Sequence, residues 1–393
     1  MKCLTYLLAA LIAAVTLAPV ANAADETRTY QIKNRLRIEH DDNIYEEPDN
    51  ENDSFKIIEE VEVLVNLNFE QSYIGLRYRP TFEWWDEREP DDDDLHHDFD
   101  VVLAHNFTPR LSLSVKDTFR LGEQPEAIEG SSLRRENGDF IYNVVDGSAS
   151  YLLRPGTRLE GSGRYTLLRY DEESVSDEED YDIYAGGLTL RHELSPETVV
   201  RGEYRLEEVE YEGPDRGSQS QFLGLGLERV FSPNLLGDSR VGYQQKDFNE
   251  EDIDDEDAPY IEGSFTFLPS PQTRLTAGAS YSLFESDIAA FASQERTTAF
   301  ISAAYDVTAR VSLYGAASYQ MGTYDADQRI EENTDVYNNE DGDENVVQFS
   351  ARLSYKVNRD NWLEANFHYL DVDSDLRDDY DRTRMSLGWR TQI

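Results

Sequence analysis

The sequence is poor in cysteine, in basic residues and in long apolar runs, and each shortage narrows what the protein can be. Its one cysteine, Cys3, lies within the first 23 residues, so a chain without that segment forms no disulfides. Only 36 lysines and arginines stand against 80 aspartates and glutamates, a net charge of −44 that argues against nucleic acid as a partner. Beyond residue 23 no apolar run reaches the roughly 20 residues of a membrane-spanning helix, so any membrane crossing must use strands.

The first 23 residues have the pattern of a secretory signal peptide. Lys2 precedes an apolar stretch from Leu4 to about Val20, and Ala21-Asn22-Ala23 supplies the small residues of a cleavage site. The apolar stretch is shorter than a membrane-spanning helix needs, which favours cleavage over anchoring. We therefore predict a signal peptide over residues 1–23 and one mature domain over residues 24–393, exported to a bacterial envelope.

An alternation with a period of two residues runs through almost all of the remaining chain. In "VRGEYRLE", residues 200–207, apolar residues and glycine alternate with arginine and glutamate. The same rhythm recurs in residues 158–167, 274–283, 311–321 and 347–357. Runs of about 10 to 15 residues are long for soluble strands but suit tilted strands that cross a bilayer. We expect one parity to face lipid and the other to face water.

Two kinds of connector alternate between these runs. Nine longer connectors, most of them acidic, fall between eight short turns. The pattern predicts an all-β protein, a transmembrane antiparallel up-and-down β-barrel of about 18 strands (16–18), with both chain ends on the short-turn side. The short turns are expected near residues 70–71, 108–109, 154–156, 195–196, 232–233, 269–271, 308–309 and 358–360.

Aromatic residues near the expected strand ends favour a membrane barrel over tandem soluble sandwiches. Sandwich strands also alternate, but they require neither alternating connector lengths nor a belt of aromatic rings. A membrane barrel places such rings at headgroup depth in an interfacial girdle. The expected girdle residues are Trp84, Trp85, Tyr170, Tyr211, Phe248, Tyr324 and Tyr369.

The end of the first run, Asp41-Asp42-Asn43-Ile44-Tyr45, resembles the opening of the putative beta-barrel porin 2 family of outer-membrane proteins. The resemblance extends through the hairpin rhythm of the chain. The last run, residues 382–393, is similar to the C-terminal strand by which outer-membrane proteins are recognised for insertion, except that Ile393 replaces the usual aromatic residue. The resemblance implies an integral outer-membrane barrel, inserted by the barrel-assembly machinery and found at times beside exopolysaccharide genes.

A barrel of this size encloses a watery interior, and the inward parity of each strand supplies its lining. Charged rings there could set ion or solute preference. The competing interpretation is that these charges pair across neighbouring strands and hold the wall together. The candidate lumen-lining residues are Arg35, Arg37, Arg77, Arg79, Arg164, Arg201, Glu203, Arg205, Arg274, Arg352, Glu364, Arg384 and Arg390.

The long connectors carry most of the acidic residues. Carboxylate oxygens are the ligands that Ca²⁺ and Mg²⁺ prefer, and bound ions would bridge acidic loops to anionic lipopolysaccharide. The connectors lack the spacing of an EF-hand, so solvated charge is the competing interpretation. The candidate metal ligands are Asp91, Asp92, Asp93, Asp94, Asp252, Asp254 and Asp255.

These patterns predict a porin-like channel for passive or gated diffusion of small hydrophilic solutes or ions. The alternatives are an accessory barrel for exopolysaccharide export or surface assembly, a structural or adhesive barrel plugged by residues 325–343, and an outer-membrane hydrolase. A hydrolase would use His96 and His97 in an outer loop, but no protease or lipase signature surrounds them, so we expect no enzyme and no cofactor. The expected partners are outer-membrane lipid, lipopolysaccharide, small solutes or polysaccharide, and divalent cations at the outer loops.

Overall fold

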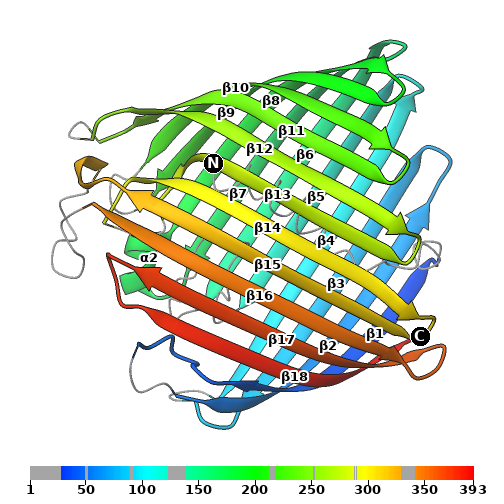
Figure 1. Cartoon of the computed structure of the whole chain (residues 1–393), viewed down its shortest axis with the longest axis vertical. Coiled ribbons are helices and arrows are strands. Elements are labelled where there is room, and N and C mark those ends of the chain that lie inside the picture. Colours follow the sequence, from blue (N-terminus) through cyan, green and yellow to red (C-terminus); the bar gives the residue numbers. More distant parts are fainter. Residues whose placement is uncertain are drawn as a thin grey trace.

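The chain forms a closed barrel of eighteen antiparallel strands (Figure 1). The computed structural model describes residues 28–48, 52–88, 92–122, 139–212, 217–250, 253–286, 288, 290–328 and 341–393, so the expected signal peptide lies outside it. The first strand pairs with both the second and the last, which leaves the sheet without an edge. The antiparallel barrel and its count of eighteen strands are therefore confirmed.

Each strand pairs with its neighbours in the sequence. A short helix, α2 (Glu173–Glu179), precedes β8, and a 3-10 turn, η1 (Ala326–Gln328), follows β15. No helix among the described residues has the length and apolar character needed to span a membrane. The strands are β1 (Tyr30–Asp41), β2 (Ser54–Asn68), β3 (Ser72–Trp85), β4 (Asp93–Thr108), β5 (Leu111–Gly122), β6 (Phe140–Arg154), β7 (Thr157–Tyr170), β8 (Tyr181–Ser195), β9 (Thr198–Tyr211), β10 (Ser218–Ser232), β11 (Leu235–Phe248), β12 (Glu256–Ser270), β13 (Thr273–Glu285), β14 (Ser293–Thr308), β15 (Val311–Tyr324), β16 (Gly342–Lys356), β17 (Asn361–Ser374) and β18 (Tyr380–Gln392).

Short turns join the strands at one end of the barrel, at all eight predicted places. Thr108 and Thr308 end their strands, and each side-chain oxygen accepts the backbone N–H groups two and three residues later, at 3.1 and 3.0 Å. Gly156 has a φ of 75°, a conformation that favours glycine over residues with a side chain. The two terminal strands also meet at this end, where the Ile393 N–H donates to the Ile32 carbonyl at 2.8 Å.

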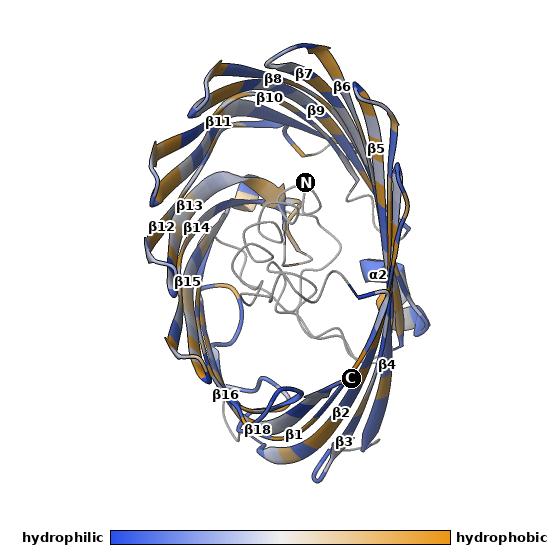
Figure 2. Ribbon diagram, turned by 90° about the vertical axis from the view of Figure 1, so that its right-hand side faces the viewer, coloured by the Kyte–Doolittle hydropathy of each residue, from blue (hydrophilic) through white to orange (hydrophobic). Residues whose placement is uncertain are grey.

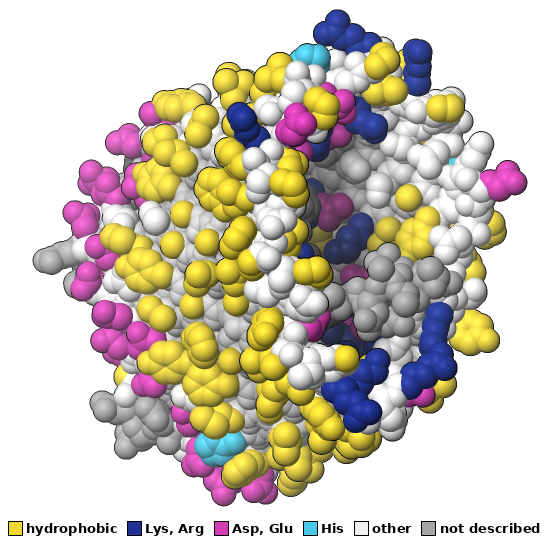
Figure 3. All heavy atoms as spheres, turned by 45° about the vertical axis from the view of Figure 1, so that its right-hand side comes forward, with side chains coloured by type: hydrophobic (Ala, Val, Ile, Leu, Met, Phe, Trp, Pro, Cys, Tyr) yellow, Lys and Arg dark blue, Asp and Glu magenta, His cyan; other side chains and the backbone are white. Residues whose placement is uncertain are grey.

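The two faces of the wall carry different side chains, as the alternation predicts. Large apolar residues of one parity point away from the barrel, and Leu225 and Leu387 are 68% and 64% exposed. Figure 2 shows the hydropathy alternating along the strands. Figure 3 shows apolar side chains over the outer surface and charged side chains within the opening. An apolar outer face and a polar inner face are what a barrel in lipid requires.

The structure has an aromatic girdle, but the prediction was wrong for several of the residues expected in it. Trp84 faces outward, whereas its neighbour Trp85 is 2% exposed on the inner face, because successive residues of a strand face opposite sides. Tyr324 is buried in the same way, and Tyr170, Tyr211 and Phe248 share the inner parity. Proximity to a strand end therefore does not decide the face. Exposed aromatic side chains encircle the barrel at its short-turn end. They are Phe69, Phe107, Tyr151, Phe231, Phe267, Tyr305, Tyr355 and Trp389.

The segment Asp41–Tyr45, which carries the family resemblance, fastens the first loop to the last strand. The Asp41 carboxylate is paired with the Arg382 guanidinium, at 2.7 Å from Nε, and both side chains are at most 4% exposed. The Asn43 side-chain amide donates to the carbonyls of Asp381 and Glu47, each at 2.9 Å. These contacts sit at the long-loop end of the β1–β18 pairing, so they secure the closure of the barrel.

We expect Arg382→Gln to weaken this closure. The substitution leaves the buried Asp41 carboxylate without its charge partner, which typically costs about 3–5 kcal/mol. Urea unfolding of the barrel in lipid vesicles, followed by gel mobility, measures the loss. The matched control is Arg359→Gln, whose parent side chain is 81% exposed in a short turn. Equal stability of the two variants would contradict the proposed role of Arg382.

Candidate functional site in the barrel lumen

A row of ion-paired arginines and carboxylates crosses the inner wall near the β1–β18 closure. Arg35 contacts a carboxylate on each side, with Nε 3.0 Å from Glu364 Oε2 and Nη1 3.1 Å from Glu60 Oε1. Arg390 binds the other oxygen of Glu364 at 3.2 Å. The pattern continues from strand to strand across the wall. In wall order the row is Glu364 (β17), Arg390 (β18), Arg35 (β1), Glu60 (β2), Arg79 (β3), Asp98 (β4) and Arg120 (β5).

A similar cluster holds the opposite part of the wall. Arg201 on β9 contacts Glu228 at 2.8 Å and Asp238 at 2.6 Å, so one guanidinium joins β9 to β10 and β11. Arg191 on β8 binds the second oxygen of Glu228 at 2.7 Å. Oppositely charged neighbours lower the repulsion that a row of like charges would create, and they leave the lining polar.

All of the predicted lumen-lining residues lie on the inner parity of their strands. Most of them pair across strands, which is the wall-holding interpretation that the sequence left open. Arg352 instead donates to the Asn366 side chain at 2.8 Å, and Arg205 lies 3.8 Å from the centre of the Phe222 ring. Arg37, Glu203 and Arg274 make no ion pair within the described part of the chain. The residues with cross-strand ion pairs are Arg35, Arg77, Arg79, Arg164, Arg201, Glu364 and Arg390.

Glu364 was predicted to line the lumen, but three other acidic partners in these pairs, Asp98, Asp100 and Asp146, were missed by the sequence prediction. On β4, Asp98 binds Arg79 and Asp100 binds Arg77. On β6, Asp146 binds Arg164. Each of them lies on the inward parity, which could have been counted from the apolar residues of the same strand. The parity signal was present, but it does not say which cation each carboxylate meets.

The end of β13 leaves the wall and turns into the space that the barrel encloses (Figure 2). Pairing of β12 with β13 stops at Ile261 and Tyr281, although both strands continue beyond these residues. The Leu283 carbonyl then accepts the side-chain amide of Gln244 on β11, at 3.3 Å. Glu285 reaches further along the wall and binds Lys246 on β11. The tail of β13 therefore passes behind β12 on the inner side.

The described residues of the segment that follows, Ser286–Ala292, are 286, 288 and 290–292, and apolar contacts anchor them inside the barrel. Ile288 and Phe291 are 1% and 0% exposed, and they pack with Tyr324 at the end of β15 and Leu376 before β18. Next to Leu376, Arg377 holds this second loop in place through Glu344 at 2.6 Å. Burial opposes the charge of Arg377, but Glu344 more than compensates and keeps the pKa of Arg377 above its usual value. The connector pattern of the sequence predicts an ordinary outer loop for residues 285–294, and the burial of Ile288 and Phe291 corrects that prediction.

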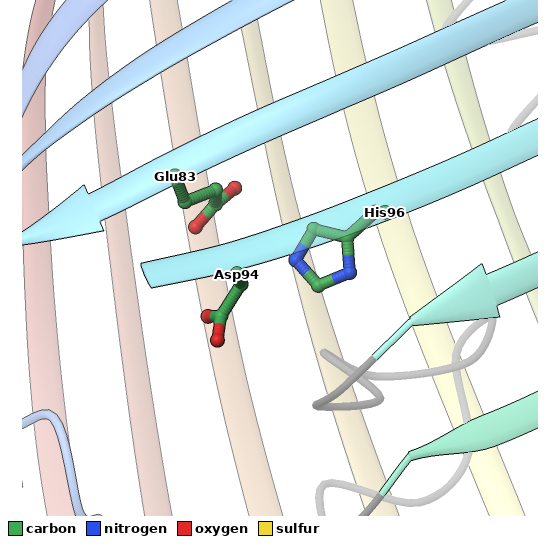
Figure 4. Close-up of side chains that lie close together, drawn as sticks. All are labelled: Glu83, Asp94 and His96. Carbon is green, nitrogen blue, oxygen red and sulfur yellow. The ribbon is translucent and has the colours of Figure 1, made fainter. Parts of the chain in front are cut away.

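One group of possible metal ligands occurs among the described residues: Glu83, Asp94 and His96, whose ligand atoms lie within 4.8 Å of one another (Figure 4). Both carboxylates are already compensated by buried cations. Lys56 contacts Glu83 at 3.2 Å, and Arg88 binds both oxygens of Asp94. A metal ion would have to displace these cations, so the group fits a salt-bridged cluster better than a metal site.

The predicted aspartate ligands do not gather into a loop site within the described residues. Asp91 and Asp252 lie outside them. Asp94 belongs to β4 and to the salt-bridged cluster. Asp92 accepts the Trp84 indole N–H at 3.3 Å, and Asp93 begins β4. Asp254 and Asp255 precede β12, where the Asp254 carbonyl accepts the Gln328 amide at 3.0 Å and Asp255 accepts the Phe248 N–H at 3.4 Å.

His96 and His97 lie in β4 rather than in an outer loop, and they face opposite sides of the wall. His97 Nδ1 lies 2.9 Å from the Tyr78 hydroxyl on the outer face. The described hydroxyl–histidine contacts include Ser72–His105 at 2.8 Å, also on the outer wall. No described contact places a carboxylate on the His105 ring, so this pair lacks the orienting third group of a catalytic triad.

Comparisons with known proteins agree with this architecture. The model of the family described as putative beta-barrel porin 2 matches residues 30–393. The fold is similar to Acinetobacter baumannii OccAB4 (12% identity, 93% of this chain and 99% of that chain, TM-score 0.51). It is also similar to OpdK from Pseudomonas aeruginosa (11% identity, 93% and 99%, TM-score 0.50) and to a BenF-like porin from Pseudomonas fluorescens (10% identity, 93% and 99%, TM-score 0.50). No curated protein matches the chain.

The salt-bridged cluster predicts how the chain responds to zinc. We expect the native barrel to take up no Zn²⁺ at micromolar concentration, because Arg88 occupies both oxygens of Asp94. Arg88→Met frees that carboxylate beside His96 and should raise Zn²⁺ affinity roughly tenfold or more. Isothermal titration of the folded barrel measures both. Arg110→Met, in an exposed turn, serves as the control, and equal zinc binding by all three proteins would contradict the competition argument.

Proposed function

Because this chain belongs to the putative beta-barrel porin 2 family and forms an integral outer-membrane β-barrel, we propose that it is a channel for small hydrophilic solutes or ions. The observation that supports the proposal most directly is the separation of the two wall faces. Leucine, valine and aromatic side chains cover the outside, whereas the inner face carries ion-paired arginines and carboxylates. Ion pairs such as Arg35–Glu364 keep a lining wet, and barrels of sixteen to eighteen strands are wide enough for water.

The charge distribution suggests a mild preference for cations at the mouth. Along the inner wall, basic residues are matched by carboxylates, as in the row through Arg35 and in the cluster around Arg201. The excess of negative charge, −44 for the whole sequence, therefore arises mainly outside these rows. An acidic rim raises the local concentration of cations and repels anions.

The inward segment Ser286–Ala292 is the element best placed to restrict passage. Its side chains Ile288 and Phe291 are buried within the enclosed space, and its position is fixed by the Glu285–Lys246 ion pair. A segment of this kind narrows a pore without closing the wall, as in channels that select by the diameter of a constriction. It gives the proposed diffusion pathway a part that could be gated.

The competing functions have less support. Because the family is described as a beta-barrel porin, we infer that the protein is a channel rather than an enzyme. A plug formed by residues 325–343 falls largely outside the described residues. Export of a polysaccharide would use the same wet interior, and no feature of the described wall favours it over diffusion of small solutes. We also infer that residues 1–23 direct the chain to the envelope.

Conductance in planar bilayers tests the channel. We expect the native barrel to form open channels. Replacing Ser286–Ala292 with a short Gly-Ser linker should raise the single-channel conductance roughly twofold, because it removes the apolar side chains from the pathway. The control shortens the connector that contains α2, a helix that contacts β7, and should leave the conductance unchanged. A barrel that never conducts would contradict the proposal, and equal conductance of all three would contradict the role of the inward segment.

A further inference from the structure

One sector of the inner wall carries few charges: the inward residues of β12 to β16 around Phe300 are mainly neutral, and the charged ones include Glu262 on β12, in register with Ser280, and Arg352 on β16. Strands β12 to β16 there present hydroxyl and amide side chains, while ion pairs fill the wall from β17 through β5. Serine, threonine and glutamine each donate and accept hydrogen bonds, unlike arginine or a carboxylate. The residues of this neutral sector are Ser264, Thr266, Thr276, Ser280, Thr298, Ser302, Ser318, Gln320, Gln348 and Ser350.

Phe300 on β14 lies at the centre of the neutral sector. Its backbone is in register with Gly278 on β13 and with Ser318 on β15, and Ser318 pairs in turn with Gln348. A Cβ at Gly278 would lie 2.6 Å from two atoms of the Phe300 ring, so the ring rests over the space that this glycine leaves. The ring is therefore held against the wall beside Gly278.

Phe300 differs from several other large aromatic residues of the inner face. Arg205 lies over the Phe222 ring at 3.8 Å, and Arg390 lies over the Trp362 ring at 4.6 Å. Phe284 and Trp85 carry cations in the same way. Within the described part of the chain, no cation and no second ring contacts Phe300, and its side chain is half-buried. It therefore offers a ring that no described cation or aromatic residue covers, among mainly neutral hydrogen-bonding groups.

We propose that Phe300 and the surrounding hydroxyls and amides form a binding step for an uncharged saccharide in the lumen. A sugar ring has an apolar face of C–H groups that packs on an aromatic ring, and a rim of hydroxyls that needs donors and acceptors together. The ring of Phe300 supplies the first, and Ser318 and Gln348 supply the second. The inference rests on the proposed channel function and names a solute class for it.

A flat aromatic anion is the nearest competing ligand. It would stack on the same ring, but it lacks the hydroxyl rim and brings a charge into a sector without a counter-ion at that level. Leaving a charge without a partner disfavours its binding in a confined, partly desolvated site. The neutral sector thus discriminates in favour of the sugar.

The test is the block of single-channel current by maltotriose, with benzoate titrated in parallel. We expect maltotriose to interrupt the current of the native channel and benzoate to have little effect. Phe300→Ala should raise the half-blocking concentration of maltotriose roughly threefold to tenfold. The matched control is Phe222→Ala, which removes a ring already covered by Arg205 and should leave the block unchanged.

A second variant separates recognition from folding. Ser318→Val with Gln348→Leu keeps the ring and the packing volume but removes the hydrogen bonds, so it should raise the half-blocking concentration of maltotriose, while native gel mobility of the barrel shows that the variant has folded. A native protein without any conductance would overturn the channel and this inference with it. Three results would overturn the saccharide site and leave the channel function intact. The native channel would conduct without being blocked by maltotriose, or maltotriose would block Phe300→Ala as strongly as the native channel, or benzoate alone would block the current.

Discussion

The demand that every backbone N–H and C=O inside lipid find a partner shapes this molecule more than any side-chain contact. A strand in a membrane satisfies that demand only when both of its edges are paired, so the sheet must close on itself. The closing pair, β1 with β18, joins segments at opposite ends of the described chain. The buried Asp41–Arg382 pair and the Asn43 amide lie beside this junction. Its two strands are the most distant in the sequence of any paired strands in the barrel, so their pairing gains least from closeness along the chain.

In a closed sheet, successive side chains of each strand alternate between the lipid face and the inner face, and this alternation determines the chemistry of both faces. Once the outward parity is apolar, everything polar in a strand must point inward, and a barrel of this size collects many charged groups in a small space. Cross-strand pairing is the way to place them there with little repulsion, as Arg35 does between Glu364 and Glu60. The sector from β12 to β16 achieves the same end with hydroxyls and amides.

Much of this architecture could be predicted from the sequence, because its signals are local. The alternation gave the inward parity of Arg35 and Arg201, and the threonine and proline residues of the turns marked the strand ends. The partners could not be predicted, since Arg35 and Glu364 are 329 positions apart. The inward course of β13 was also hidden, because Leu283 continues the same alternation after the strand has left the wall. Trp84 and Trp85 show the limit of a rule based on strand ends alone.

Because the end of β13 turns inward, it is separated from the part of β12 with which it would otherwise pair. Continuing the register beyond Ile261 and Tyr281 would set Tyr260 opposite Ser282 and Ala258 opposite Phe284. Here β13 keeps its pairing with β14 as far as Glu285 and Ser293, and on its other side the Leu283 carbonyl accepts the Gln244 side-chain amide. Pairing the end of β13 with β12 again would exchange that side-chain contact for main-chain hydrogen bonds, so a molecule that binds one of the two arrangements more tightly than the other would change the wall itself.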